Sequence, residues 1–499
     1  MPAREGSNMV FHKVSSRRLY VLFCLFQAWN KRNSIELESV RSRKATQVVS
    51  CLNFIAWGSL IDSLSLRAII RKEPRMKHST HPGPNSRASL DFDVRIADAI
   101  KDSVKIGDPL GGRAEIGAAF SLPQSGDGGE IQDYGRQGHS AGKKIENIIA
   151  AGERGMHAYC FSDGMRAIAA ATEIVTQPQD LVLMHRSIYG GTVRYLTRKF
   201  KGDQTVPREN HIPKFELDTI DLTSPTAADE IRARKPRLIV GETVTNPLLD
   251  VVDMEPIMKA AKDVGAFMIL DNTLSTGRAC LPLEVARSVH FENLMDVLSL
   301  TKGYTAGMLS GAVVTDNEKL AKALFEIRRA DGGPLSSEAT PLIEAGLKSM
   351  RVRMTQLSQT TQALVEYLSN DTIPGIEVLH PFVATGRQRE LAEKYLHGYP
   401  AIVTLRCALP HERFEALASA LSTVFIRANS FNGVFPTMSE SAKQSHASVK
   451  DAQTKAAAGV SEGLLRLSPS SLYPEDTIVE RVRDGIHSWL KTVVISTGN

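Results

Sequence analysis

Short apolar runs alternate with helical patterns along the middle of the chain. The runs predict strands at about residues 157–161, 181–185, 237–242, 267–271 and 297–300. Apolar residues between them recur at helical spacing, as in Met254–Val264, where Asp253 is expected as the N-cap and Gly265 as the C-cap. Alternating strands and helices predict an α/β fold with a mostly parallel sheet.

A different pattern begins near Ser336. One apolar face runs along a long predicted helix and consists of Ile343, Leu347, Met350, Met354, Leu357, Leu364 and Leu368. Strands are expected at 375–380 and 401–405, and helices at 410–421 and 477–490. This second part predicts a smaller α+β domain. We therefore divide the chain into a basic extension (1–90), an N-terminal arm (91–150), a large domain (151–345) and a small domain (346–499).

The first ninety residues differ from the rest of the chain. The apolar run Leu19–Trp29 follows two arginines and is too short to span a bilayer comfortably. A signal peptide, a transit peptide, a disordered extension and a wrongly assigned start of translation all fit this segment. We favour a disordered extension or a wrong start, and with it a cytoplasmic protein, while targeting to an organelle stays open.

Charge and cysteine content narrow the class of protein. The chain is 42% hydrophobic and 23% charged, as expected of a globular protein. Its formal charge of +5 comes from residues 1–90, which have a net charge of +10, whereas the remainder has −5. This distribution gives no support for a nucleic-acid partner, and no membrane partner is expected. The five cysteines are widely spaced, which argues against a disulfide framework or a metal site.

One lysine stands out because it follows a predicted buried strand. Lys302 comes after the apolar run 296–300 and precedes a glycine-rich segment. A lysine in such a place can be desolvated and made nucleophilic, as a Schiff base with an aldehyde requires. A structural lysine is the alternative.

Other polar residues follow the remaining predicted strands. Asp271 is either an N-cap or an acid that keeps a pyridine nitrogen protonated, and Asn246 lies beyond the strand that ends near residue 242. Tyr189 offers an aromatic face, with a tyrosine at a glycine turn as the alternative. Ser162-Asp163-Gly164-Met165 has the layout of a phosphate cradle or of a simple helix cap. A cradle, an aromatic ring, an amide, an acid and a lysine are what pyridoxal phosphate needs.

The ordered motifs resemble one enzyme family over residues 130–490. They are Tyr134-x-Arg136, Asp163-Gly164-Met165, Tyr189-Gly190-Gly191-Thr192-x-Arg194, Glu242 with Asn246-Pro247, Asp271-Asn272-Thr273, Ser299-x-Thr301-Lys302, Gly346-Leu347-Lys348 with Arg353-Met354, Ser445–Val449 and Arg466-Leu467-Ser468. The chain resembles the Cys/Met-metabolism (trans-sulfuration) enzymes that depend on pyridoxal 5′-phosphate, most of all cystathionine γ-synthase and γ-lyase. This resemblance implies the fold-type I architecture of aspartate aminotransferase.

The resemblance also implies a role for each matching residue. Lys302 would form the internal aldimine and move protons, Asp271 would pair with the pyridine nitrogen, and Tyr189 would stack on the ring and act as a base, which makes these three the catalytic residues. Gly164, Met165, Ser299 and Thr301 would hold the phosphate, Asn246 would lie near the phenolic oxygen, and Arg466 and Ser430 would hold the substrate carboxylate, with Arg194 as a further substrate-binding residue. Tyr134 and Arg136 would reach the phosphate of a neighbouring subunit, which implies a homotetramer built as a dimer of dimers.

The chain departs from the family pattern close to these residues. Gly303 stands where a tyrosine is usual, Ala306-Gly307 replaces a Gly-His pair, and Asn429 replaces an acid before Ser430. The resemblance implies an enzyme that makes or breaks the γ C–S bond of cystathionine-like or O-acylhomoserine substrates. Two alternatives remain: a γ-replacement enzyme that uses another nucleophile, and a degenerate homologue without catalysis.

Overall fold

The computed structural model describes residues 87–103, 134–201, 216–370, 373–431, 434–444, 455 and 458–496. Residues 1–86, the Ser445–Val449 motif and most of the glycine-rich arm lie outside the described residues. All described segments fall within one compact unit, 80–499. No described helix is long and apolar enough to cross a membrane.

The larger sheet has seven strands. In spatial order they are β1 (His157–Phe161), β7 (Gly311–Thr315), β6 (Leu294–Leu298), β5 (Phe267–Asp271), β4 (Leu238–Glu242), β2 (Leu181–His185) and β3 (Glu216–Ile220). The strands from β3 to β6 are parallel, and β7 runs antiparallel to both of its neighbours. The predicted mostly parallel α/β sheet is confirmed.

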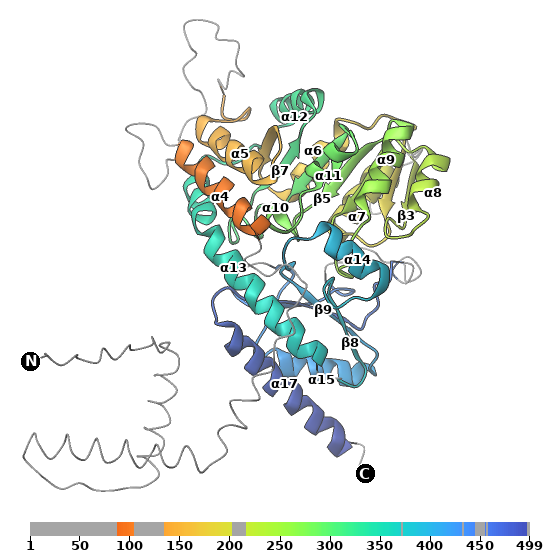
Figure 1. The fold of residues 1–499 in the computed structure, drawn as a ribbon, viewed down its shortest axis with the longest axis vertical. Helices are drawn as coiled ribbons and strands as arrows, with labels where there is room; N and C mark the ends of the chain where they lie inside the picture. Colours follow the sequence, from red (N-terminus) through yellow and green to blue (C-terminus); the bar gives the residue numbers. More distant parts are fainter. Residues whose placement is uncertain are drawn as a thin grey trace, which may run out of the picture. The chain divides into compact units, whose positions relative to one another are not determined.

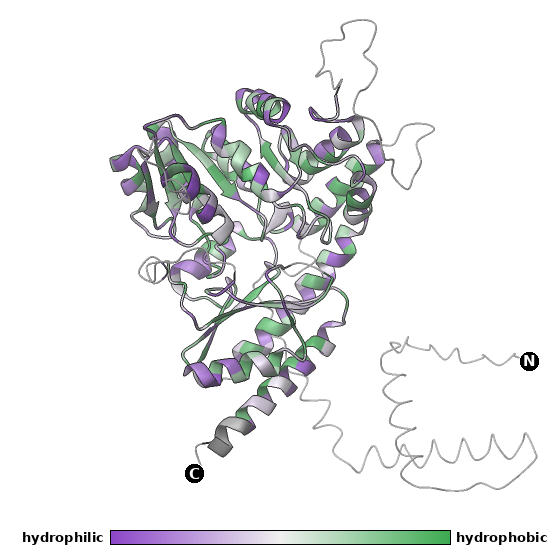
Figure 2. Ribbon diagram, turned by 180° about the vertical axis from the view of Figure 1, so that it is seen from behind, coloured by the Kyte–Doolittle hydropathy of each residue, from purple (hydrophilic) through white to green (hydrophobic). Residues whose placement is uncertain are grey.

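Helices cover both faces of this sheet, as Figure 1 shows. One apolar cluster contains side chains of α6 (Gly164–Glu173), α7 (Gly190–Lys201) and α12 (Glu318–Asp331). The other contains side chains of α4 (Arg87–Asp102), α5 (Ser140–Glu153), α8 (Ala227–Arg234), α9 (Met254–Val264) and α11 (Pro282–Ser288). In Figure 2 the strands between these helices are mostly green, in keeping with burial on both faces.

A second sheet forms the smaller part. Its order is β10 (Ile426–Arg427), β11 (Thr437–Glu440), β12 (Leu464–Ser468), β9 (Val403–Cys407) and β8 (Ile376–Leu379). The helices α15 (His411–Leu421) and α17 (Glu475–Ser496) pack against this sheet, whereas α14 (Gly386–Tyr395) packs against the core of the large sheet. The second α+β layer is thus present as predicted, and it carries Arg466 on its central strand β12.

One long helix, α13 (Thr340–Asn370), connects the two parts. It contacts α4 and α5 at one end and α17 at the other, as Figure 1 shows. All seven residues of its predicted apolar face are buried. The predicted domain boundary at 345/346 falls inside this continuous helix, and the division into domains stays a prediction.

The caps of α9 are placed as predicted, whereas strand β6 is not. Asp253 is the N-cap and Gly265 the C-cap of α9, with φ of 70° at Gly265; the Asp253 side chain makes no capping hydrogen bond but accepts hydrogen bonds from Tyr395 (2.7 Å) and Arg387 (2.8 Å). Strand β6 begins at Leu294 and ends at Leu298 rather than covering 297–300. It ends there because the Ser299 N–H bonds to the Thr273 hydroxyl (2.7 Å), so the chain leaves the ladder.

We expect the buried ion pair between Glu146 and Arg328 to matter for stability. Arg328 is 2% exposed, and the Glu146 carboxylate also accepts the Cys160 N–H at 3.0 Å. Glu146→Gln leaves a buried charge without its partner, so the free energy of unfolding should fall by about 3 kcal/mol in urea unfolding. As the control, Glu318→Gln removes an exposed partner of Lys322 and should leave the free energy unchanged. Equal losses in both variants would contradict the prediction.

Candidate active site

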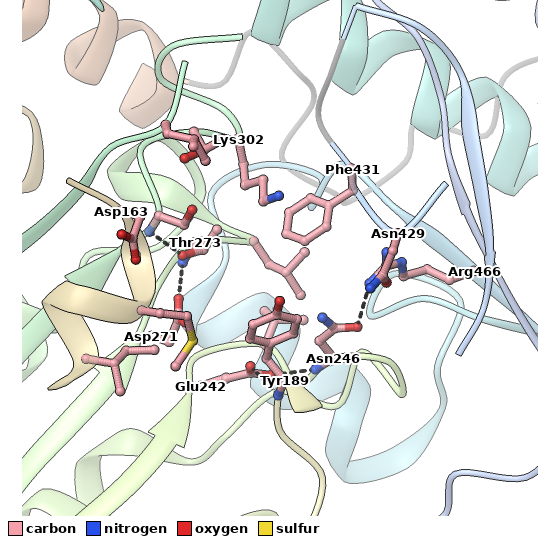
Figure 3. Close-up of a pocket in the computed structure, with 18 residues that line it drawn as sticks. Asp163, Tyr189, Glu242, Asn246, Asp271, Thr273, Lys302, Asn429, Phe431 and Arg466 are labelled. Atoms are coloured by element: carbon pink, nitrogen blue, oxygen red, sulfur yellow. Dashed lines mark hydrogen bonds between the residues drawn. The ribbon is translucent and has the colours of Figure 1, made fainter. Parts of the chain in front are cut away.

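The pocket lies where the parallel strands of the large sheet end. Its cavity is about 340 Å³. The predicted residues that line it are Gly164, Met165, Tyr189, Asn246, Asp271, Ser299, Thr301, Lys302 and Arg466. Because β1, β2, β4, β5 and β6 all run in one direction, the loops that follow them meet at one edge of the sheet. Figure 3 shows these side chains converging from both parts of the molecule.

Lys302 lies in the turn after β6 and points into the pocket (Figure 3). Its Nζ donates a hydrogen bond to the Ser430 hydroxyl (3.0 Å) and lies 5.4 Å from the centre of the Phe431 ring. Burial lowers the pKa of Lys302, the nearby Arg466 charge lowers it further, and Asp271 opposes both. A lysine in this state reaches its neutral, nucleophilic form at a lower pH than an exposed lysine.

Asp271 is the last residue of β5 and faces the same pocket. Its Oδ1 accepts the Thr273 N–H at 2.9 Å. Burial raises the pKa of Asp271, whereas the hydrogen bonds from Thr273 and the charge of Lys302 lower it. A buried carboxylate that lacks a full ion pair is suited to hold a cationic N–H group.

The turn after β1 forms the predicted cradle at the start of α6. Asp163 caps the helix by accepting the Arg166 N–H (2.8 Å), and its other oxygen accepts the Ser162 hydroxyl (2.9 Å). Both Asp163 oxygens are therefore engaged in the turn itself. A Cβ at Gly164 would meet the Cβ of Ser299 at 2.8 Å, so only glycine allows these two backbones to approach. The helix cap is present, and the role of the turn as a phosphate cradle stays a prediction.

Arg466 enters the pocket from the central strand of the small sheet. It is 2% exposed, its Nη1 donates to the Asn246 Oδ1 (3.0 Å), and its guanidinium lies 5.2 Å from the centre of the Phe431 ring. Burial lowers the pKa of Arg466 to about 10, so the group stays charged at neutral pH. Nη2 has no hydrogen-bond partner among the residues that the structure describes. A buried donor of this kind calls for an anion, and a carboxylate fits it.

Tyr189 lies between the end of β2 and the start of α7. Its ring folds back over Gly191, where a Cβ would meet the ring at 2.4 Å. Its backbone N–H donates to Glu242 Oε1 (2.8 Å), and the Asn246 N–H donates to Glu242 Oε2 (2.6 Å). The backbone of the Tyr189 loop is thus held by a buried carboxylate at the end of β4.

Four predicted residues do not line this pocket, although one of them, Ser430, accepts the hydrogen bond from Lys302. Tyr134 is 43% exposed, and Arg136 lies 5.6 Å from the centre of the Tyr134 ring and donates to the Arg329 carbonyl. Arg194 is exposed on α7. The roles of Tyr134 and Arg136 toward a neighbouring subunit, and of Arg194 toward a substrate, stay predictions.

Several lining residues had no predicted role, among them Glu242 and Phe431, which contact other site residues by hydrogen bonds or ring faces. Glu242 belonged to a motif that carried the family resemblance. Its hydrogen-bond partners, however, are two backbone N–H groups, and these cannot be read from the sequence. Phe431 lay in a segment noted for its departure from the family. It contacts both cations of the pocket. The position of Glu242 at the end of a predicted strand could have indicated a site residue. No comparable sequence feature pointed to Phe431.

The departure after Lys302 has a structural reason. A Cβ at Gly303 would lie 3.1 Å from Thr276 and 3.4 Å from Met354. The following tyrosine, Tyr304, is 1% exposed, and its hydroxyl donates to the buried Glu153 carboxylate. Tyr304 therefore anchors the lysine turn to α5.

Comparisons with known proteins agree with this geometry. The family model described as "Cys/Met metabolism PLP-dependent enzyme" matches residues 118–471. Cystathionine beta-lyase MetC of Bacillus subtilis is 29% identical over 69% of this chain and 83% of its own, and cystathionine gamma-synthase of Mycobacterium leprae is 29% identical over 72% and 89%. The crystal structure of cystathionine gamma synthase from Xanthomonas oryzae pv. oryzae, in complex with aminoacrylate and cysteine, superposes with a TM-score of 0.71 at 27% identity, covering 80% of this chain and 99% of that one.

Gly164→Ala tests the cradle. The added methyl group must displace Ser299, which is expected to hold the phosphate of the cofactor. Because this displacement would remove one charge-assisted hydrogen bond, we expect the affinity for pyridoxal phosphate to fall about tenfold. Titration of the cofactor followed by visible absorbance measures this. Gly485→Ala on α17 is the control, because its Cβ would have only ordinary contacts, the nearest at 3.4 Å. Unchanged affinity in Gly164→Ala would contradict the role of the cradle.

The pKa of Lys302 can be tested on the cofactor-free protein. The rate of reductive methylation of each lysine, followed by mass spectrometry against pH, reports the neutral amine. We expect a lower midpoint for Lys302 than for the exposed Lys322, because burial and Arg466 disfavour the charged form. Arg466→Met removes the repulsion, so the Lys302 midpoint should rise. A shared midpoint for Lys302 and Lys322 would refute this electrostatic account.

Proposed function

Because this chain belongs to the Cys/Met-metabolism family of pyridoxal-phosphate-dependent enzymes, we propose that it makes or breaks the γ C–S bond of cystathionine-like or O-acylhomoserine substrates. It is a carbon–sulfur lyase or γ-replacement enzyme of the trans-sulfuration type, and its substrate is a small amino acid. The relatives just named include a β-lyase and a γ-synthase at the same identity, so likeness alone does not choose the direction of the reaction.

The convergence of Lys302, Asp271, Tyr189 and Arg466 on one cavity carries this proposal. The cavity has the size of a small cofactor site. Gly164 and Ser299 line the pocket at the start of α6, where backbone N–H groups suit a phosphate. Nη2 of Arg466, which has no partner among the described residues, suits a substrate carboxylate. The pocket therefore fits both pyridoxal phosphate and an α-amino acid.

Each side chain has a distinct task in the proposed mechanism. Pyridoxal phosphate, when bound, supplies a ring that withdraws electrons from the bonds at the substrate's Cα. Asp271 would hold the proton of the ring nitrogen, Tyr189 would stack on the ring, and Gly164, Met165, Ser299 and Thr301 would hold the phosphate. Lys302 would anchor the cofactor. Its Nζ would take up and return the proton of the substrate's Cα, a task that its lowered pKa favours.

The substrate end of the pocket is built from the small sheet and its loops. Arg466 and Ser430 would hold the α-carboxylate, with Arg194 as a further contact for the substrate. We also propose that the enzyme is a homotetramer of two dimers, in which Tyr134 and Arg136 serve the neighbouring subunit; their position outside this pocket supports that role. A cytoplasmic location stays a prediction.

A γ-replacement enzyme with another nucleophile is the second candidate. It is favoured by Asn429 and Phe431, which line the pocket next to Ser430. A non-catalytic homologue is the third, and the retained lysine, acid and arginine argue against it.

A substrate panel separates these functions. Purified enzyme with pyridoxal phosphate is given cystathionine, O-acetylhomoserine with cysteine, or methionine, and cysteine, 2-oxobutyrate, cystathionine and methanethiol are assayed. Turnover of cystathionine, or its formation, is expected. Lys302→Ala should lower turnover at least about a thousandfold, since it removes the proton-transferring amine, whereas Lys322→Ala on the surface of α12 should not. A visible cofactor band without turnover of any of these substrates would favour the second candidate, and absence of the band would favour the third.

A further inference from the structure

Glu242 is the last residue of β4 and lies beneath the pocket with 5% exposure. Its two carboxylate oxygens bond to different loops. Oε1 accepts the Tyr189 N–H (2.8 Å) from the loop after β2, and Oε2 accepts the Asn246 N–H (2.6 Å) from the loop after β4. One side chain thus fixes two loops at a set separation (Figure 3).

The connection continues into the small sheet. The side chain of Asn246 accepts Nη1 of Arg466 at 3.0 Å, while Nη2 of Arg466 has no partner in the described part of the chain. A continuous series of hydrogen bonds therefore runs from the Tyr189 backbone through Glu242 and Asn246 to Arg466. This series joins the Tyr189 loop of the large sheet to Arg466 of the small sheet.

We propose that Glu242 is a positioning residue, which sets the place of Arg466 relative to Tyr189 and thereby couples carboxylate binding to stacking on the cofactor ring. The inference rests on the roles proposed above for Arg466 and Tyr189. Glu242 acts through the two backbone N–H groups that it accepts, and a carboxylate suits this because both of its oxygens accept.

The alternative is that Glu242 only stabilises the fold. Burial raises the pKa of Glu242, as does the neighbouring Asp271, while the two N–H bonds and Arg466 oppose this shift. A buried acid with such partners would cost stability when replaced in either case. Stability alone therefore cannot separate the two roles, and substrate affinity must be measured with it.

Glu242→Gln is the test variant. Glutamine keeps one accepting oxygen but turns an N–H₂ group toward the other backbone N–H, so one of the two loops loses its tie. The probe is L-norleucine, an amino acid without a γ-leaving group, whose binding to the pyridoxal-phosphate-loaded enzyme is followed by visible absorbance. We expect the Kd for norleucine to rise about tenfold and the visible circular dichroism band of the cofactor to change.

A double-mutant cycle with Arg466→Lys tests whether the effect passes through Arg466. In the Arg466→Lys variant, we expect the further change Glu242→Gln to have little effect on norleucine binding. The arginine that Glu242 positions is already replaced there. Additive losses would overturn the proposal. Glu242→Asp, which is too short to reach both N–H groups, should behave like Glu242→Gln and serves if the glutamine variant does not fold.

Glu146→Gln is the matched control, because Glu146 is also buried and accepts a backbone N–H but lies outside the pocket. It should lower the unfolding midpoint without changing the Kd for norleucine. A normal Kd in Glu242→Gln, with wild-type binding intact, would overturn this inference alone. Absence of cofactor and norleucine binding in the wild-type enzyme would overturn the proposed function, and this inference with it.

Discussion

The parallel direction of β1, β2, β4, β5 and β6 is the constraint on which the site depends. Parallel strands bring their carboxyl ends to one edge, so each loop that follows a strand can place one polar side chain beside the others. Asp271 closes β5, Lys302 lies in the turn after β6, and the glycine cradle follows β1. Residues separated by more than a hundred positions therefore share a single cavity.

Burial of charge gives the cavity its chemistry. Desolvation disfavours the charged forms of Lys302 and Asp271, and each group lies close enough to the other to offset part of that cost. Arg466 remains charged and has an unused donor. The pocket thus presents an amine ready to lose its proton, an acid ready to hold one and a cation ready for a carboxylate. A pyridoxal-phosphate enzyme that acts on amino acids requires this combination.

The departures from the family pattern fall into two physical classes. Gly303 is a packing feature, because the next residue, Tyr304, is buried and hydrogen-bonded to Glu153. Asn429 and Phe431 lie in the pocket itself, and Phe431 presents its ring to both cations. Gly303 and Tyr304 therefore belong to the packing that holds the lysine turn. Asn429 and Phe431 belong to the wall of the pocket, where a change of side chain alters what the pocket can contact.

The sequence by itself determined the α/β fold, the apolar face of α13 and the residues at the strand ends, because periodicity and local turn chemistry are written in neighbouring positions. It misplaced β6, whose end is decided by the hydrogen bond that the Ser299 N–H donates to the Thr273 hydroxyl, and it could not tell that the Asp253 side chain at the N-cap of α9 accepts from Tyr395 instead of capping the helix. Only the tertiary structure decided that Glu242 joins two loops and that Phe431 lies between two cations. Those contacts link residues distant in sequence, and no local pattern encodes them.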